Sequence, residues 1–290
     1  MATGYGPVVQ SALLRNELVR LRRERKLTQE QVARDLEWSP SKLIRIEGGK
    51  TSITKSDLQV LLLQYGVTGG EQADRLQELA RGAREPAWWN IYRGQIPDIF
   101  YAFLGYEAGM SYLRDYQGSV IPGLLQTPEY AEIITSGAVG PVEVGTVVRI
   151  RLQRQQEVAQ RENPPERTYI LDEAVIRRHV GVKRDPGIMP AQLAHLARIA
   201  REDDHVTVRV IPFSVGAHPG MREGSFAVLE FEAGLSDVLY QEGGRGPSVM
   251  FTGDDPLISD YRDAFEILRE ESLSPEKSVA LIEEAAEAMM

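Results

Sequence analysis

The 290-residue sequence predicts a mainly α N-terminal domain followed by an α+β C-terminal domain. In the first part of the chain, apolar residues recur at helical spacing, and residues that commonly cap helices precede them. In the second part, helical patterns are interrupted by short runs such as 206–210, where valines alternate with polar residues as in a half-buried strand. The length of the chain also favours two domains over one or three.

The first predicted helix carries leucines at positions 14, 18 and 21 on one face. Its end is crowded with cations, namely Arg20, Arg22, Arg23, Arg25 and Lys26. Cations are favourable at the C-terminus of a helix, and they can also contact phosphates, so the two interpretations are compatible. A fourth helix, beginning after Thr54, completes a small core with further leucines.

Between these helices, residues 28–51 predict two short helices joined by a tight turn. Thr28 can cap the first of them, and Gln31 can reach back to form a capping box. The second begins after Ser39, with Pro40 at its first position, and a Gly-Gly pair ends it. This is a helix-turn-helix, a motif whose second helix lies in the major groove of DNA.

On a helical wheel, Ser41 and Arg45 of this second helix lie opposite Leu43 and Glu47, with Lys42 at the side. Ser, Lys and Arg side chains bind base edges or phosphates. At the start of the preceding helix, the backbone N–H and the side-chain amide of Gln29 can hold a phosphate. The expected DNA-binding residues are Thr28, Gln29, Ser39, Pro40, Ser41, Lys42, Arg45 and Lys50. The alternative is a solvated helical hairpin, but the capping, apolar spacing and basic outer face together favour DNA binding.

The segments TQEQVARDL and SPSKLIRIEGGKT resemble the Xre-type helix-turn-helix of lambdoid repressors and their bacterial relatives, over residues 11–68. That family usually has glycine in the turn, whereas this chain has Leu36-Glu37-Trp38; a residue other than glycine with positive φ costs about 1–2 kcal/mol. Ile44 stands where the family often has a small polar residue. Its side chain is expected either to touch a thymine methyl or to pack on its own domain.

Charge is distributed unevenly along the chain. Residues 1–60 contain eleven Lys and Arg against seven Asp and Glu, a net charge of +4, which leaves −13 for the remainder of the total of −9. A basic head on an acidic body suits a protein that contacts DNA at one end only. The chain has no cysteine, no signal-peptide pattern and no apolar run of membrane-spanning length, so we expect a cytoplasmic protein without a membrane segment.

We expect a flexible tail over residues 1–10, the DNA-binding domain over 11–68, a helical linker over 69–97 and a regulatory α+β domain over 98–290. An aromatic cluster around the end of the linker includes Trp88, Trp89, Tyr92 and Phe100. It can line a ligand pocket or a protein interface, or it can simply anchor the linker to the core of the next domain, which is the commoner role of such clusters.

In the second domain, helices are predicted at about 98–116, 128–137, 142–161, 190–201, 256–271 and 275–289. Strands are predicted at 168–171, 206–210, 226–231 and 238–241. This half contains GLLQTPEY, LDEAVIRRHVG and VTVRVIPFSVGAHPGMREGSFAVLEF, and is similar to the C-terminal domain of an actinobacterial regulator family that includes WhiJ-type and Scr1-family, antitoxin-like proteins. The resemblance implies transcriptional control beside a small acidic partner protein encoded nearby, with no established ligand.

The second domain shows no arrangement typical of an enzyme. Asp172 and Glu173 are adjacent, and one of them is better explained as the cap of a helix near Ala174 than as part of an acid–base pair. The four histidines have no metal-ligand spacing. The long loop that contains His218 is the best candidate for a lid or contact loop. We therefore expect no catalytic residue, no metal and no cofactor.

Together these features predict a sequence-specific transcriptional repressor. Because a helix-turn-helix head has a small footprint, we expect a homodimer on two half-sites of a double-stranded DNA operator. The C-terminal domain would then mediate dimerisation and sense a signal. Two alternatives remain for that signal: a small molecule bound near the aromatic cluster, or a small partner protein that an antitoxin-like module binds.

Overall fold

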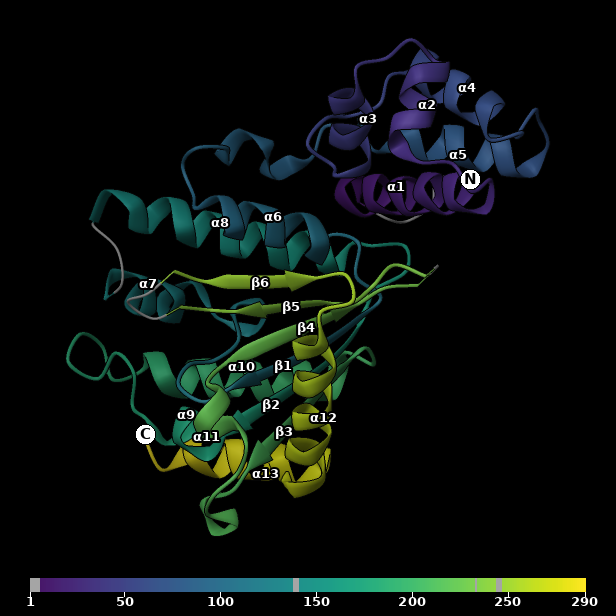
Figure 1. Cartoon of the computed structure of the whole chain (residues 1–290). Helices are drawn as coiled ribbons and strands as arrows, with labels where there is room; N and C mark the ends of the chain where they lie inside the picture. The colour runs from purple at the N-terminus through teal and green to yellow at the C-terminus, as the bar shows by residue number, and fades with distance from the viewer. Residues whose placement is uncertain (1–5, 138–140, 233, 244–246) are drawn as a thin grey trace. The chain divides into compact units, whose positions relative to one another are not determined.

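The computed structural model describes residues 6–137, 141–232, 234–243 and 247–290, and divides the chain into two compact units (Figure 1). The first unit contains Met1–Gly109 together with Phe231–Leu235, and the second contains Met110–Glu230 and Ser236–Met290. The expected α+β fold class is confirmed, because a helical N-terminal part precedes a part that combines helices with a six-stranded sheet.

The secondary-structure elements of the first unit, among its described residues, are helices. Its helices are α1 (Pro7–Glu24), α2 (Gln29–Asp35), α3 (Pro40–Glu47), α4 (Lys55–Gln64), α5 (Glu71–Gly82), the 3₁₀ helix η1 (Trp88–Tyr92) and α6 (Asp98–Glu107). Leu18, Leu43, Leu61 and Leu76, from four different helices, are almost completely buried in one core. Since Leu76 belongs to α5, that helix is part of the folded head and not a linker.

The expected tail over residues 1–10 is wrong for its second half, because α1 begins at Pro7; residues 1–5 lie outside the described ranges. The reason is a long-range contact. Val8 and Val9 pack on Gly105 and Gly109, where an added Cβ would overlap their side chains. Val9 is fully buried as a result. A sequence window of ten residues contains nothing that reveals this partner.

The second unit is built on a six-stranded sheet in the order β3-β2-β1-β4-β5-β6. The strands are β1 (Tyr112–Gln117), β2 (Glu166–Asp172), β3 (Val206–Ile211), β4 (Phe226–Glu230), β5 (Val238–Gln241) and β6 (Val249–Thr252). Strands β1, β2 and β3 are parallel, whereas β4, β5 and β6 pair antiparallel to their neighbours. The carboxyl ends of β1, β2, β3 and β5 therefore lie at one edge of the sheet.

The expected helix over 98–116 is wrong beyond Glu107, where α6 ends and the central strand β1 follows. Strand β1 has the sequence YLRDYQ. Its two adjacent central charges interrupt the alternation of apolar and polar residues that identifies a strand, and the preceding residues have a helical pattern. Within the fold, the guanidinium of Arg114 pairs with Glu230 and Glu266, and it lies over the Tyr112 ring. Strand β6, an exposed edge strand, is also absent from the sequence-based prediction.

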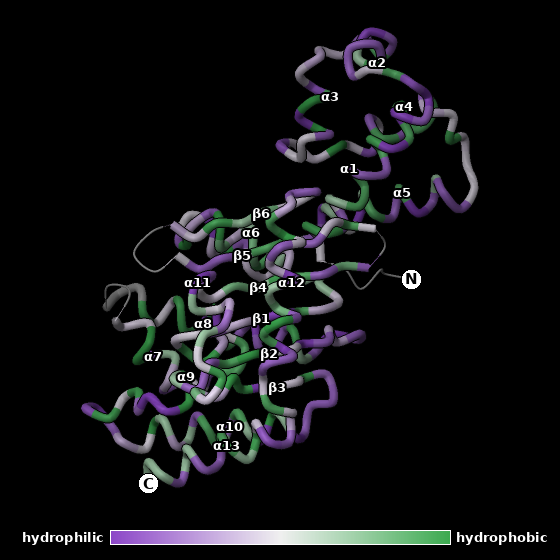
Figure 2. Tube along the Cα trace, turned by 60° about the horizontal axis from the view of Figure 1, so that its bottom comes forward, coloured by the Kyte–Doolittle hydropathy of each residue, from purple (hydrophilic) through white to green (hydrophobic). Residues whose placement is uncertain are grey.

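Helices surround the sheet of the second unit. They are α7 (Pro128–Ser136), α8 (Pro141–Ala159), α9 (Glu173–Arg177), α10 (Ile188–Glu202), α11 (Gly220–Glu223), α12 (Pro256–Glu271) and α13 (Pro275–Glu287), with 3₁₀ helices η2 (Gly123–Leu125) and η3 (Phe213–Val215). Tyr261, Phe265 and Leu268 of α12 pack on Tyr116 and Phe226 of the sheet. Helices α10 and α13 pack together and alternate between hydrophobic and hydrophilic residues along their length (Figure 2).

We predict that Gly220→Ala lowers the free energy of unfolding of the second unit by about 1–3 kcal/mol, because a Cβ at Gly220 would overlap the buried Tyr116 ring. Gly145→Ala is the matched control: its Cβ would meet only the end of the Arg149 side chain, and alanine favours the helix by about 1 kcal/mol. Urea denaturation followed by circular dichroism measures both. Equal stability of Gly220→Ala and the unmodified protein would contradict the packing described here.

Candidate nucleic-acid interface

The N-terminal caps of α2 and α3 fix where the two helices of the motif begin. The Thr28 hydroxyl accepts a hydrogen bond from the Gln31 N–H at 3.1 Å, and the Gln31 side chain accepts one from the Thr28 N–H at 2.8 Å, so the predicted capping box is present. Ser39 is the N-cap of α3 and Pro40 begins the helix, as predicted. The Ser39 hydroxyl, however, lies 3.2 Å from that of Ser41 and makes no capping bond to the backbone.

The turn between α2 and α3 has a left-handed residue that is not glycine. Glu37 has a φ of 56°, as its position in the turn predicts, and the Trp38 N–H donates to the Ala33 carbonyl at 2.7 Å. Lys26, between α1 and α2, adopts the same φ of 56° and is not apparent from the sequence pattern. Both residues carry the backbone strain that glycine would relieve.

A buried carboxylate joins the first three helices. The Arg22 guanidinium donates to both oxygens of Glu47, at 2.7 and 2.8 Å, and the Gln29 side chain donates to one of them at 2.6 Å. The Glu47 side chain is only 4% exposed. The hydrogen bonds that Arg22 donates to Glu47 raise the pKa of Arg22, which stays charged. Two charged hydrogen bonds in parallel fix α3 against α1 with little rotational freedom.

The outward face of α3 presents Ser41, Ile44 and Arg45. All three are exposed, and Ile44 is 51% exposed, which excludes the alternative that it packs on its own domain. Within the described ranges, the Arg45 side chain makes no hydrogen bond or ion pair. Lys42 differs: its ammonium lies 2.6 Å from the Asp57 carboxylate and 3.9 Å from the centre of the Trp38 ring. The outward face of α3 therefore presents the guanidinium of Arg45 and the exposed Ile44 side chain toward solvent.

The remaining predicted DNA-binding residues divide into two groups. Thr28, Pro40 and Lys50 are exposed beside the ends of α2 and α3. Gln29 is half-buried, and its amide is directed to Glu47 and not to solvent, so the prediction that this amide holds a phosphate does not agree with the geometry.

Most of the cations at the end of α1 have partners within the protein. Arg22 pairs with Glu47, and Arg20 pairs with Glu17 and Glu24. Arg25 donates to the Tyr65 carbonyl at 2.9 Å, and its guanidinium lies where a side chain at Gly66 would be. Contacts within the protein thus account for Arg20, Arg22 and Arg25 of this basic cluster. Arg23 and Lys26 are exposed.

The aromatic cluster is largely buried. Trp89 and Tyr92 are 3% and 8% exposed, and the half-buried Trp88 ring meets both of them edge to face. The half-buried Phe100 ring stacks on Phe103 at 6.1 Å. This packing agrees with an anchoring role for Trp89 and Tyr92. From the sequence alone, a ligand pocket or a protein interface was also open.

The His218 side chain is buried, so it is not an exposed contact of the loop that carries it, and the role of this loop as a lid or contact loop stays a prediction. The side chain of His218 is 3% exposed, and Nε2 lies 3.1 Å from the Asp172 carboxylate, with the Tyr116 ring edge to face at 6.0 Å. The other carboxylate oxygen of Asp172 caps α9 by accepting from the Ala174 N–H at 2.8 Å, as predicted. The loop follows the carboxyl edge of the sheet and is held there by this pair.

Two families match the chain. A helix-turn-helix domain matches residues 13–76, which include α2 and α3. A domain of unknown function, DUF5753, matches residues 100–284, more than half of the chain. The chain belongs to the DUF5753 family. No curated protein and no solved structure matches it. The helix-turn-helix domain makes this member of the DUF5753 family a DNA-binding regulator.

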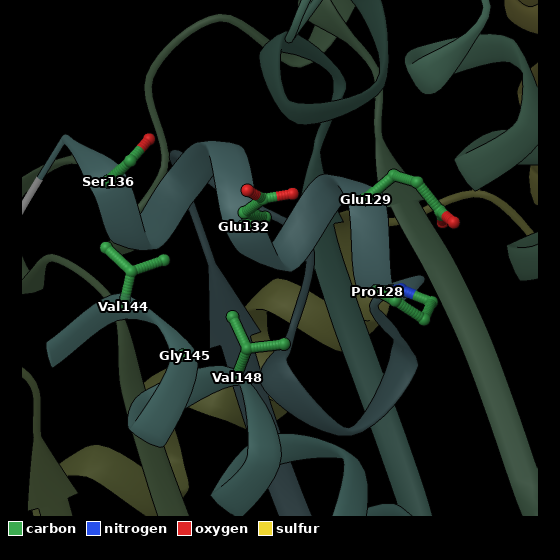
Figure 3. A pocket seen from close by; sticks show the side chains of 7 residues that line it. All are labelled: Pro128, Glu129, Glu132, Ser136, Val144, Gly145 and Val148. Carbon is green, nitrogen blue, oxygen red and sulfur yellow. The ribbon is translucent and has the colours of Figure 1, made fainter. Parts of the chain in front are cut away.

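The DUF5753 region has a groove between α7 and α8 that the sequence did not indicate (Figure 3). Its volume is about 490 Å³, and it is lined by Pro128, Glu129, Glu132, Ser136, Val144, Gly145 and Val148. The two valines point from α8 toward α7, which carries the two glutamates. Glu132 also pairs with Arg184 at 3.2 Å. An apolar floor with carboxylates at its rim does not suit an acidic ligand.

Of the helices that the structure describes in this DUF5753 protein, none combines the length and apolar composition that a membrane span requires. Likewise, the described residues include no group of three or more His, Asp or Glu side chains placed to hold a metal ion.

The helical wheel places Glu47 on the inward face of α3, but it does not identify the residues that bind its carboxylate. Arg22 lies 25 residues away in the sequence, and Gln29 lies 18 away. The only available signal was a carboxylate at a position that must be buried, which requires a nearby cation.

We predict that Glu47→Ala lowers the free energy of unfolding by about 3–5 kcal/mol, because Arg22 would remain buried without a counter-charge. Glu24→Ala, which removes an exposed partner of Arg20, should change it by at most about 1 kcal/mol. The double variant Arg22→Met/Glu47→Leu should recover most of the loss. Chemical denaturation of the three variants tests this, and equal effects of the two single changes would refute it.

We predict that Glu37→Gly raises the free energy of unfolding by about 1 kcal/mol, because glycine adopts the positive φ without strain, although it gains entropy on unfolding. Arg34→Gly is the control: it places glycine inside α2 and should lower stability by about 1 kcal/mol. Thermal denaturation of the two variants should give shifts of opposite sign. A destabilised Glu37→Gly protein would mean that the turn is not strained.

Proposed function

We propose that this protein is a sequence-specific transcriptional repressor of the Xre type that binds operator DNA through α3. The observation that carries the proposal is the division of α3 into two faces. Glu47 and two buried apolar residues hold its inner face, whereas Ser41, Ile44 and Arg45 are presented outward with no role in the core. A helix fixed in this way can be inserted into the major groove without rearrangement.

In this proposal, Arg45 makes the principal base contact. An arginine that is free to extend can donate two hydrogen bonds to guanine, the commonest specific contact in the major groove. Ile44 supplies an apolar contact to a thymine methyl. Lys42 is assigned a lesser role than the sequence suggested, because Asp57 already neutralises much of its charge. Thr28, Ser39, Pro40 and Lys50 would lie along the phosphate backbone.

We further propose that the protein acts as a homodimer, since one α3 reads only a few base pairs and a second head would double the contact. The two half-sites would lie about 34 Å apart, one turn of the double helix. The DUF5753 region is assigned the dimerising and signal-sensing role, in line with its resemblance to WhiJ-type and Scr1-family regulators. It is given no catalytic role, because His218 and Asp172 serve to hold a loop and cap a helix.

The alternative function is that of an antitoxin-like module controlled by a small partner protein. The groove between α7 and α8 is a concave surface on which such a partner could dock. Its carboxylates, however, favour a basic segment, whereas the resemblance implies an acidic partner. The proposal therefore places an acidic partner elsewhere on the DUF5753 region.

We predict that Arg45→Ala weakens binding to the cognate operator by about 1–3 kcal/mol and relaxes preference at one base pair of each half-site. The measurement is a gel-shift titration of the protein with its own upstream DNA and with random DNA, at two salt concentrations. The physical reason is the loss of two hydrogen bonds to one base, which no phosphate contact replaces.

Arg20→Ala is the control for charge alone, because it removes the same charge from a guanidinium that Glu17 and Glu24 already hold. It should leave operator preference unchanged. If both variants lose affinity equally on operator and random DNA, Arg45 is a phosphate contact and the proposed base reading is incorrect.

A further inference from the structure

The first unit contains a pocket between α4 and α5 that none of the predicted DNA-binding residues lines. Its volume is about 300 Å³, at the lower end of the range for small-molecule sites. The pocket lies within one compact unit of the chain and not between the two. It is lined by Lys55, Leu58, Gln77, Ala80, Arg81 and Arg84.

This pocket has an apolar floor and a cationic rim. Leu58 and Ala80 are 1% and 3% exposed, so they form its inner wall. Lys55, Arg81 and Arg84 are exposed around them. The described lining residues thus carry three positive charges and no carboxylate. A pocket with this division suits a ligand that is anionic at one end and apolar at the other.

The three cations of the rim have no counter-charge within the described residues. Neither Lys55 nor Arg81 forms a hydrogen bond or an ion pair there. Arg84 donates to the Ile53 carbonyl at 3.3 Å, and this acceptor is neutral. Like charges around one pocket repel one another, and a bound anion would convert this repulsion into attraction.

Helix stability explains one of these cations but not another. Arg81 lies in the last turn of α5, where the helix dipole favours a positive charge. Lys55 is the first residue of α4, where the dipole disfavours one. The carboxylate of Asp57, in the same turn, lies 2.6 Å from the Lys42 ammonium. The position of Lys55 is therefore unfavourable for the helix, and its charge is available to a ligand.

The composition of the pocket favours a small organic anion over the backbone of DNA. Each phosphodiester of DNA carries a single negative charge, and it has no apolar group to place on Leu58 and Ala80. A small dianion concentrates two charges at one point, where guanidinium groups can offer paired N–H donors and an ammonium can add a point charge.

We propose that this pocket binds a small organic dianion. Lys55, Arg81 and Arg84 hold its charged group, and its apolar part rests on Leu58 and Ala80. Phosphate monoesters and dicarboxylates share this chemistry. The inference stands apart from the DNA-binding proposal, because dianion binding is measured without DNA.

The test is calorimetric titration of the full chain, in chloride at fixed ionic strength. Phenyl phosphate and phthalate are the two probes, one for each kind of dianion, and the tighter of them identifies the charged group. Benzyl alcohol carries a ring without the charge, and inorganic phosphate carries the charge without a ring. Each of these should bind at least tenfold more weakly than the tighter dianion.

Arg81→Gln removes one charge from the rim and keeps a side chain that suits a helix. We expect this variant to fold, as judged by circular dichroism, and to bind the tighter dianion at least tenfold more weakly. Arg75→Gln is the matched control, because Arg75 is exposed on the same helix and does not line the pocket. It should bind the dianion as the unmodified protein does.

Lys55→Gln tests the rim from α4. We expect it to weaken dianion binding without lowering the melting temperature of the free protein, because it removes a cation from the start of a helix. Dianion binding that survives in both pocket variants would overturn the proposal. So would an equal loss in Arg75→Gln, or binding of neither dianion by the unmodified protein. If no dianion binds and Arg81→Gln instead loses affinity for a random-sequence DNA duplex, the cations belong to the DNA surface.

Discussion

The Glu47 carboxylate is the interaction on which the helix-turn-helix depends. It is removed from water at the end of α3, and it is stable there only because Arg22 of α1 and Gln29 of α2 donate to it. One buried acid thus sets the distance and angle among three helices. The exposed face of α3 owes its orientation to this inner contact, so the solvent-facing and core-facing halves of the helix are fixed together.

The sheet of the second unit is joined to a covering helix by partly buried charges. Arg114 lies on the central strand β1, where its guanidinium meets Glu230 of the neighbouring strand and Glu266 of α12. It also lies over the rings of Tyr112 and Phe265. The polar groups of β1 therefore join the sheet to the helix that covers it.

Local patterns predicted the elements whose signals lie within a few residues. The capping box at Thr28 and the start of α3 at Pro40 follow from short-range stereochemistry. The left-handed turn at Glu37 was indicated by the resemblance to the Xre-type motif, whose turn usually carries glycine. Side-chain roles at the candidate DNA surface were predicted less well. Lys42 and Gln29 have the right residue types, but Asp57 and Glu47, 15 and 18 residues away, already bind them.

By itself, the sequence determined that a helix-turn-helix precedes an α+β domain, since helical and strand periodicities are properties of contiguous residues. Only the tertiary structure decided which polar residues meet. It joined Val9 to Gly109, converting an expected tail into helix, and it buried His218 against Asp172. It also brought Lys55 and Arg81 to one pocket. These contacts depend on burial and close packing between distant segments, and the free energy of a charge or a cavity is set by its surroundings in space.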